Sequence, residues 1–145
     1  MEQTHATCVD IDGAGILLRG PSGSGKSDLA LRLIEAGARL VADDRADLKL
    51  DGGKVVASAP AAIKGRIEVR GVGILEVNPV PRTALKLVVD LVTPDKVDRL
   101  PGPATAELLG VELPLFRLTA FEASAPAKVR AALKAANGGP RGTRR

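Results

Sequence analysis

The stretch Gly20-Pro21-Ser22-Gly23-Ser24-Gly25-Lys26-Ser27 decides the fold of this 145-residue chain. It matches in full the pattern Gly-x-x-x-x-Gly-Lys-Ser, in which glycines let the backbone curl until several N–H groups point inward. The apolar run 16–18 precedes the loop, and residues 26–36 carry apolar side chains at helical spacing. Strand, loop and helix in this order predict a phosphate-binding loop that holds a nucleoside triphosphate, or a similar anion, with a divalent metal.

Each residue type in the loop has a predicted task. The ammonium of Lys26 reaches the β- and γ-phosphates, and the hydroxyl of Ser27 is a ligand for Mg²⁺. The remaining loop residues offer backbone N–H groups to phosphate oxygens: Gly20, Pro21 (by its neighbours, since proline has no N–H), Ser22, Gly23, Ser24 and Gly25. The alternative is a glycine-rich turn that only starts a helix.

Composition limits the class of protein. The length suits one domain, and 45% apolar residues are enough for a core. The chain has no run of about 18 uncharged apolar residues, so we expect no membrane span. Residues 1–5 lack the basic and apolar segments of a secretory signal. The single cysteine, Cys8, suits a reducing compartment, so we expect a cytoplasmic protein.

The basic balance of the chain lies partly at its end. The formal charge is +4, with Lys134, Arg141, Arg144 and Arg145 contributing to the excess. Two phenylalanines are the only aromatic residues, whereas a single-strand nucleic-acid binder needs stacking platforms. We therefore expect no nucleic-acid partner, a domain over residues 1–137 and a flexible, solvated basic tail over residues 138–145.

Short apolar runs separated by turn residues predict many strands and two helices. Asp51-Gly52-Gly53 marks a hairpin, Gly13-Ala14-Gly15 a turn, and Gly138-Gly139-Pro140 the end of the second helix. The predicted fold is an α/β P-loop nucleotide-binding domain with a mixed, strand-rich sheet. Helices are expected at residues 26–36 and 127–136, and strands at residues 6–12, 16–18, 39–42, 48–50, 54–57, 66–69, 74–77, 85–92 and 113–118.

Several polar residues outside the loop are open to two interpretations. Asp43-Asp44 ends a hydrophobic strand, where carboxylates near a phosphate loop bind metal or accept a proton, but where turns and caps are also common. Taken alone, Glu68 is equally a solvated strand residue, His5 an incidental terminal histidine and Arg99 a surface charge.

Together these pieces resemble the catalytic domain of the HPr kinase/phosphorylase family. The resemblance covers nearly the whole chain. Residues 67–74, Ile-Glu-Val-Arg-Gly-Val-Gly-Ile, are its most discriminating part, because they are similar to the family signature Glu-Ile-Arg-Gly-Leu-Gly-Ile. Further matches are His5 at the family's spacing before the loop, residues 26–31, the two-aspartate segment 40–44 and, more weakly, residues 98–100 and 109–114.

The resemblance implies a role for each matching residue. Asp44 would take the proton of a serine hydroxyl during phosphorylation, with His5 and Arg99 as further active-site groups. Lys26 would stabilise the transferred phosphoryl group, and Ser27 and Glu68 would hold Mg²⁺. The implied reaction moves phosphate from ATP or pyrophosphate to a serine of the carrier protein HPr. Long family members form hexamers, so self-association is expected here.

The chain departs from the family in four respects, one of which is that the region between Val77 and Val97 is shorter than in long members. The N-terminal domain of longer members is absent from the sequence, which suggests a short form. Asp28 stands where the family usually has glutamate. Residues 119–126 replace a basic loop, similar to Pro-Val-Arg-Pro-Gly-Arg-Asn, which the family links to dephosphorylation. This stretch has no arginine and one glutamate, so we expect kinase activity to be retained and phosphorylase activity to be weakened or lost.

Two alternatives to a protein serine kinase remain. A small-molecule P-loop kinase is one, although no arginine-rich lid insertion is evident. A nucleotide or phosphate sensor with little catalysis is the other.

Overall fold

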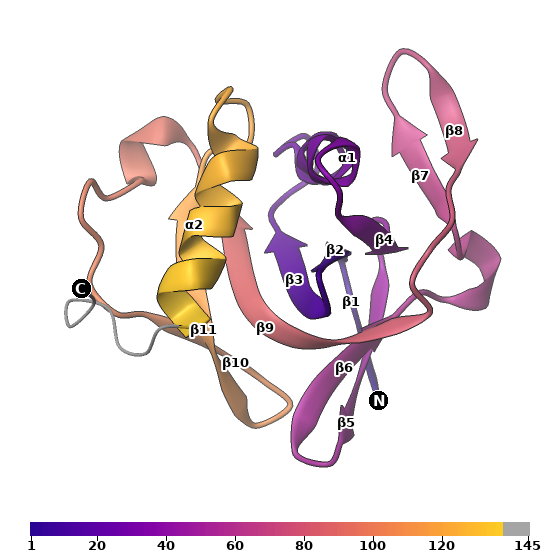
Figure 1. Ribbon diagram of the computed structural model, residues 1–145, viewed down its shortest axis with the longest axis horizontal. Coiled ribbons are helices and arrows are strands. Elements are labelled where there is room, and N and C mark those ends of the chain that lie inside the picture. Colours follow the sequence, from indigo (N-terminus) through magenta and orange to yellow (C-terminus); the bar gives the residue numbers. More distant parts are fainter. Residues whose placement is uncertain (138–145) are drawn as a thin grey trace.

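One long strand, β9 (Arg82–Leu91), organises the computed structural model, which describes residues 1–137 (Figure 1). It lies in a nine-stranded mixed sheet, beside which β7 and β8 form a two-stranded hairpin. The predicted mixed, strand-rich α/β architecture is confirmed. The other elements are β1 (Glu2–Thr4), β2 (Ala6–Ile11), β3 (Ala14–Arg19), α1 (Lys26–Glu35), β4 (Arg39–Ala42), β5 (Ala46–Asp51), β6 (Lys54–Ser58), β7 (Arg66–Val69), β8 (Gly73–Glu76), β10 (Thr105–Leu108), β11 (Val111–Leu118), α2 (Ala125–Asn137) and the 3-10 turns Ala61–Ile63 and Pro94–Lys96.

Strand β9 connects two differently built parts of the sheet. Its first residues pair antiparallel with β6, and its later residues pair parallel with β3 on one side and β11 on the other. The strands run in the order β1-β5-β6-β9-β3-β2-β4, with β11 joined to β9 and β10 joined to β11. Since β3, β9 and β11 are parallel, their carboxyl ends meet at one edge of the sheet.

The alternation of side chains along the strands divides the core in two. On β3, Ile16 and Leu18 lie among residues of both helices, whereas Leu17 lies among residues of β5, β6, β10 and β11. Both helices therefore cover one face of the sheet. On the other face, the side chains of β3 pack against the β5–β6 and β10–β11 hairpins. Neither helix in the described part of the chain is long and apolar enough to cross a membrane.

Helix α1 confirms the helix predicted from residue 26. Gly37, with a φ of 112°, follows its end, as expected for a residue just beyond a helix. The tail at residues 138–145 and the glycine-proline stop after α2 lie outside the described residues.

Three strand predictions need correction. β1 and β10 were not expected, because three and four residues carry little periodicity and each strand depends on a distant or hairpin partner. The turn between β2 and β3 lies at Asp12-Gly13 rather than at residues 13–15. Gly15 belongs to β3, where a Cβ would come within 2.7 Å of the Thr83 side chain, so its glycine serves close packing rather than a turn.

Cys8 lies in the centre of β2, fully buried between β3 and β4. Burial raises the pKa of its thiol well above the usual range, and the neighbouring carboxylate of Asp10 acts in the same direction. The thiol is thus a small apolar core group rather than a nucleophile.

Candidate active site

The carboxyl ends of the parallel strands border a cavity of about 430 Å³. Residues from the loop after β3 line its floor, residues after β4 and in β7 line one flank, and Phe121, after β11, lines the other. The sheet order explains these two flanks, because β4 and β11 each lie two strands away from β3 on opposite sides. The lining residues are Ser22, Gly23, Gly25, Lys26, Ser27, Asp28, Leu31, Asp43, Asp44, Glu68, Val69, Arg70 and Phe121.

The backbone of the loop requires its glycines. Gly25, which precedes α1, has a φ of 97°, and a Cβ there would come within 2.7 Å of Ala120. A Cβ at Gly20 would come within 2.4 Å of the Ser24 hydroxyl oxygen. Because Gly25 has no side chain to cap α1, the N–H groups of the first helical turn face the cavity as donors for an anion.

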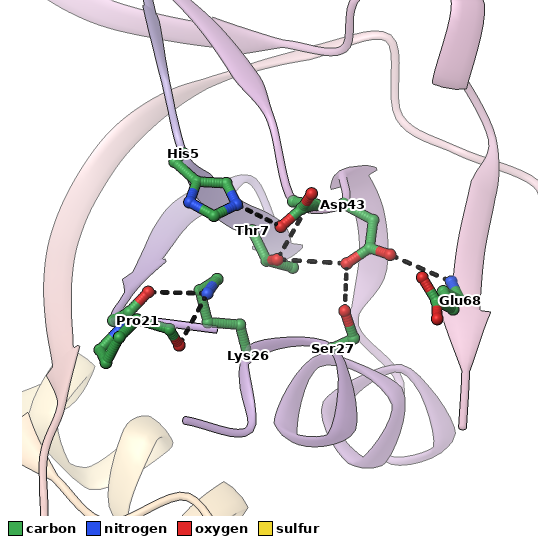
Figure 2. Close-up of polar contacts among 9 residues, drawn as sticks. His5, Thr7, Pro21, Lys26, Ser27, Asp43 and Glu68 are labelled. Atoms are coloured by element: carbon green, nitrogen blue, oxygen red, sulfur yellow. Dashed lines mark hydrogen bonds and ion pairs between the residues drawn. The ribbon is translucent and has the colours of Figure 1, made fainter. Parts of the chain in front are cut away.

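Lys26 is nearly buried at the mouth of the loop. Its ammonium donates to the carbonyl oxygens of Gly20, at 2.7 Å, and Pro21, at 3.2 Å (Figure 2). A buried ammonium needs partners of this kind, and phosphate oxygens in the loop would offer it stronger, charged ones.

Asp43 is the centre of the polar network (Figure 2). Its Oδ1 accepts hydrogen bonds from the hydroxyls of Ser27, at 2.6 Å, and Thr7, at 3.2 Å. Its Oδ2 accepts one from the backbone N–H of Glu68, at 3.0 Å. Asp43 is only 7% exposed, so these three donors fix the orientation of a carboxylate that burial would otherwise disfavour.

Asp44 points differently from its neighbour because its backbone is left-handed, with a φ of 72°. This conformation is uncommon outside glycine, although aspartate tolerates it better than most residues. The Thr7 hydroxyl accepts a hydrogen bond from the Asp44 N–H at 3.0 Å, which holds the turn. Asp43 therefore turns inward to Ser27, and the exposed Asp44 carboxylate pairs with Nε2 of His5 at 2.7 Å.

The oxygen atoms at the cavity suit Mg²⁺. The hydroxyl of Ser27 lies against a carboxylate, and the Glu68 side chain lines the same cavity. Magnesium in phosphate-loop proteins takes a hydroxyl, a carboxylate, waters and substrate phosphates rather than a cage of protein ligands. Residues 1–137 contain no cluster of three or more acidic, histidine or cysteine side chains that could hold a metal ion.

Arg32, on α1, holds the flank of the cavity that Phe121 lines, which we call the apolar flank. Its guanidinium donates to the carbonyl oxygens of Ala120 and, at 3.0 Å, Glu122, the two residues beside Phe121. It also pairs with Asp28 at 2.8 Å. The ring of Phe121 remains 66% exposed against Gly25.

The structure brings most of the predicted site residues together. Lys26, Ser27, Asp44 and Glu68 line the cavity, and His5 reaches it through Asp44. Gly20 and Pro21 bind the Lys26 ammonium through their carbonyls, and the Ser24 hydroxyl lies close to Gly20 within the loop. Arg99 is the exception, because it is exposed in the segment after the Pro94–Lys96 turn and does not line the cavity.

Six residues that line the cavity were not predicted as site residues, and two of them, Asp43 and Phe121, bear directly on how the site is built. Asp43 was named only as half of an acidic pair, yet it contacts Ser27 directly. A buried strand that ends in a carboxylate after a phosphate loop was the available signal. Phe121 gave no signal of its own, because only the parallel pairing of β11 with β9 brings it to the loop.

A glycine loop at a strand end, a helix that begins on it and an adjoining serine–aspartate pair are the features of an α/β domain of the P-loop class. Comparison with known families then specifies which one. The model of the HPr Serine kinase C-terminal domain matches residues 1–134, and this chain belongs to that family.

Individual relatives agree with this assignment. HPr kinase/phosphorylase of Lactobacillus acidophilus is 41% identical over 122 residues, which are 76% of this chain and 38% of that protein. The Clostridium tetani protein of the same name is 52% identical over 73 residues, 50% of this chain and 24% of that protein. The chain thus spans well under half the length of these relatives.

A solved structure, that of the Hpr(Ser) kinase/phosphatase from Coxiella burnetii, is similar to the whole fold. The TM-score is 0.83 at 30% sequence identity, and the match covers 92% of this chain and 89% of that one. The identity and the near-complete coverage confirm the fold class beyond the phosphate loop itself.

Proposed function

We propose that this domain is a Mg²⁺-dependent protein serine kinase that transfers a phosphoryl group from ATP or pyrophosphate to a serine of an HPr-like phosphocarrier protein. One observation carries the proposal. A phosphate loop, a Ser27–Asp43 contact and a separately oriented Asp44 carboxylate lie at a single cavity. The names of the relatives supply the protein substrate, and the chemistry of the cavity supplies the reaction.

In the proposed reaction, Asp44 accepts the proton of the substrate serine while the serine oxygen forms a bond to the terminal phosphorus of the donor. The bond from that phosphorus to the bridging oxygen breaks, and ADP, or phosphate when pyrophosphate is the donor, leaves. Pairing with His5 orients the Asp44 carboxylate. Lys26 and the N–H groups of the loop neutralise charge on the phosphate oxygens, which is the main catalytic need of phosphoryl transfer.

Magnesium, when bound, would neutralise phosphate charge and align the donor. Ser27 would ligate it directly, and Asp43, held by three donors, would orient that hydroxyl or a metal-bound water. We assign Glu68 as a further metal group, because its carboxylate lines the cavity while its N–H binds Asp43. Arg99 stays a prediction as a catalytic group, because it does not line the cavity.

The reverse reaction, removal of phosphate from phosphoserine by inorganic phosphate, is proposed to be weak. The loop 119–124 has no basic residue, and its one carboxylate, Glu122, pairs with Lys128 at 2.8 Å. Phe121 is the side chain that this loop presents to the cavity. Rapid phosphate-dependent dephosphorylation of phospho-HPr by the purified protein would contradict this part of the proposal.

The wider setting is proposed in the same terms. Residues 1–137 form the kinase domain, HPr-like protein is the partner, and the protein acts in the cytoplasm with no nucleic-acid or membrane partner. Self-association, with the hexamer of long family members as the precedent, stays a prediction.

The direct experiment incubates the protein with Mg²⁺, HPr and ATP labelled on the γ-phosphate. We expect the label on one serine of HPr, and none on an HPr variant with that serine replaced by alanine. Labelled pyrophosphate in a parallel reaction identifies the second donor. Nucleotide binding without transfer to HPr would favour a sensor, and label in a small molecule would favour a metabolite kinase.

A further inference from the structure

Phe121 is an exposed aromatic ring at the edge of the phosphate cavity. The chain has only two aromatic residues, and the other one, Phe116, packs against the core. Phe121 is 66% exposed although it lies against the backbone of Gly25 and lines the cavity with Leu31. A large apolar side chain kept in water beside a polar cavity suggests that a ligand covers it.

The sheet determines which part of a ligand could reach the ring. Phe121 follows β11 and the Asp43-Asp44 pair follows β4, so they border the loop from opposite sides. The proposed acceptor serine must meet the terminal phosphate beside Asp44. The remainder of the donor, beyond its phosphates, then extends away from Asp44 and towards Phe121.

The backbone on both sides of Phe121 is held by hydrogen bonds before any ligand binds. Arg32 donates to the carbonyl oxygens on both sides of Phe121, and the Thr119 hydroxyl donates to the Val92 carbonyl at 2.8 Å. Lys128 fixes Glu122 from α2. A platform ordered in advance costs little entropy on binding.

We propose that Phe121 is the platform on which the base of a nucleoside triphosphate stacks, so that this cavity selects nucleotide over pyrophosphate as the phosphoryl donor. The inference rests on the proposed function for the direction in which the donor lies. It goes beyond that function by choosing between its two donors. Every base has a π-face, so stacking favours nucleotides in general and does not distinguish one base from another.

Binding measured without HPr tests the proposal. Titration calorimetry with Mg²⁺ should show that Phe121→Ala binds ATP about tenfold more weakly, while binding of tripolyphosphate and pyrophosphate changes less than about twofold. Phe121→Leu, which keeps an apolar side chain without a ring, should lose ATP affinity as the alanine variant does. Its unchanged binding of tripolyphosphate verifies that the loop still folds. Equal losses for ATP and the inorganic phosphates, or no loss for ATP, would overturn the proposal.

A second measurement uses the absence of tryptophan from the chain. In Phe121→Trp, the new indole should change its fluorescence when ATP binds and should not respond to tripolyphosphate. The matched control is Leu50→Trp, at an exposed position in the β5–β6 hairpin, which should respond to neither. An indole at position 121 that responds equally to both ligands would contradict stacking.

The outcome is separable from that of the proposed function. If ATP binding depends on Phe121 but HPr is not phosphorylated, the donor assignment stands and the kinase proposal fails. If HPr is phosphorylated equally well from ATP and pyrophosphate, with Phe121→Ala unchanged, the kinase proposal stands and the platform fails.

Discussion

The two flanks of the cavity at the phosphate loop differ in chemical character, since the flank after β4 is polar and the flank after β11 is apolar. On the β4 flank, Asp43 is buried and accepts three hydrogen bonds, and Asp44 is set apart from it by a left-handed turn. On the β11 flank, an exposed ring stands on a loop that an arginine holds by its carbonyl oxygens. The polar flank fixes charges at defined positions, whereas the apolar flank offers a flat surface.

This difference suggests a division of labour. Proton transfer and metal binding need oriented carboxylates, which tolerate little displacement. Recognition of a base needs area and rigidity but no charge. Substitutions on one flank should therefore change the reaction with little effect on donor choice, and substitutions on the other should do the reverse.

The largest effect is expected on the polar flank at Asp44. Asp44→Asn keeps the size and tolerates the left-handed turn but cannot accept the serine proton, so phosphoryl transfer to HPr should fall about a thousandfold. ATP binding, followed by calorimetry, should stay within about twofold. Asp47→Asn, beside Gln3 on the outer strand β5, is the matched control and should leave transfer unchanged. Retained transfer in Asp44→Asn would remove Asp44 from the chemistry.

Asp43→Ala should affect both stability and metal use. It leaves the hydroxyls of Ser27 and Thr7 and the N–H of Glu68 without their acceptor, which should lower the free energy of unfolding by about 2 kcal/mol in urea titrations. Asp43→Asn, which retains one acceptor oxygen, should lose less stability while the Mg²⁺ dependence of ATP binding weakens by about tenfold. If both variants bind Mg²⁺–ATP normally, the Ser27–Asp43 contact has only a structural role.

On the apolar flank, Arg32→Met should release the loop that carries Phe121. We expect ATP affinity to fall by about threefold to fivefold through lost preorganisation, with pyrophosphate binding unaffected. Arg130→Met removes a similar contact, to the Ala36 carbonyl at 3.0 Å, away from the cavity and is the matched control. In the double variant with Phe121→Ala, the Arg32 change should add little, since both act on one platform. Full additivity would show that Arg32 acts independently of the ring.

The smallest effect concerns Cys8, which lies beneath the polar flank and takes no part in the chemistry. Because its pKa is raised in the folded state, the thiol ionises first in the unfolded chain. At neutral pH it contributes no pH dependence, but above about pH 8.5 the free energy of unfolding should fall by up to about 1.4 kcal/mol per pH unit. Cys8→Ala should lack this component in urea titrations between pH 8 and 10. An identical slope in both proteins would contradict the burial of the thiol.

What could be predicted from the sequence depends on whether a residue's neighbours in space are close to it or distant from it along the chain. The glycine-rich loop and helix α1 are local, so their glycines and apolar spacing were sufficient. For the turn between β2 and β3 the glycines gave only the approximate place, because Gly15 belongs to β3. Glu68 and His5 could be proposed only through the family resemblance, because their neighbours in space are distant in sequence. Phe121 reaches the loop through the pairing of β11 with β9, and no local pattern encodes a parallel partner.

Prediction from the sequence missed the contact that Asp43 makes with Ser27, and it assigned a role to Arg99, which does not line the cavity. Asp43 followed a recognisable strand, but only the geometry distinguishes the inward carboxylate from the outward one beside it. Arg99 was assigned from a weak local match, and it lies on an exposed segment whose course no periodic pattern determines.

The course of β9 has a consequence for how the domain opens. One continuous strand pairs with β6, β3 and β11, so neither part of the sheet can separate without breaking hydrogen bonds that the other part shares. Amide protons of Val88 and Val89, paired on both sides, should then exchange with solvent only when the whole domain unfolds. The two flanks of the cavity thus belong to a single cooperative unit, and their separation is kept constant by the strand that runs between them.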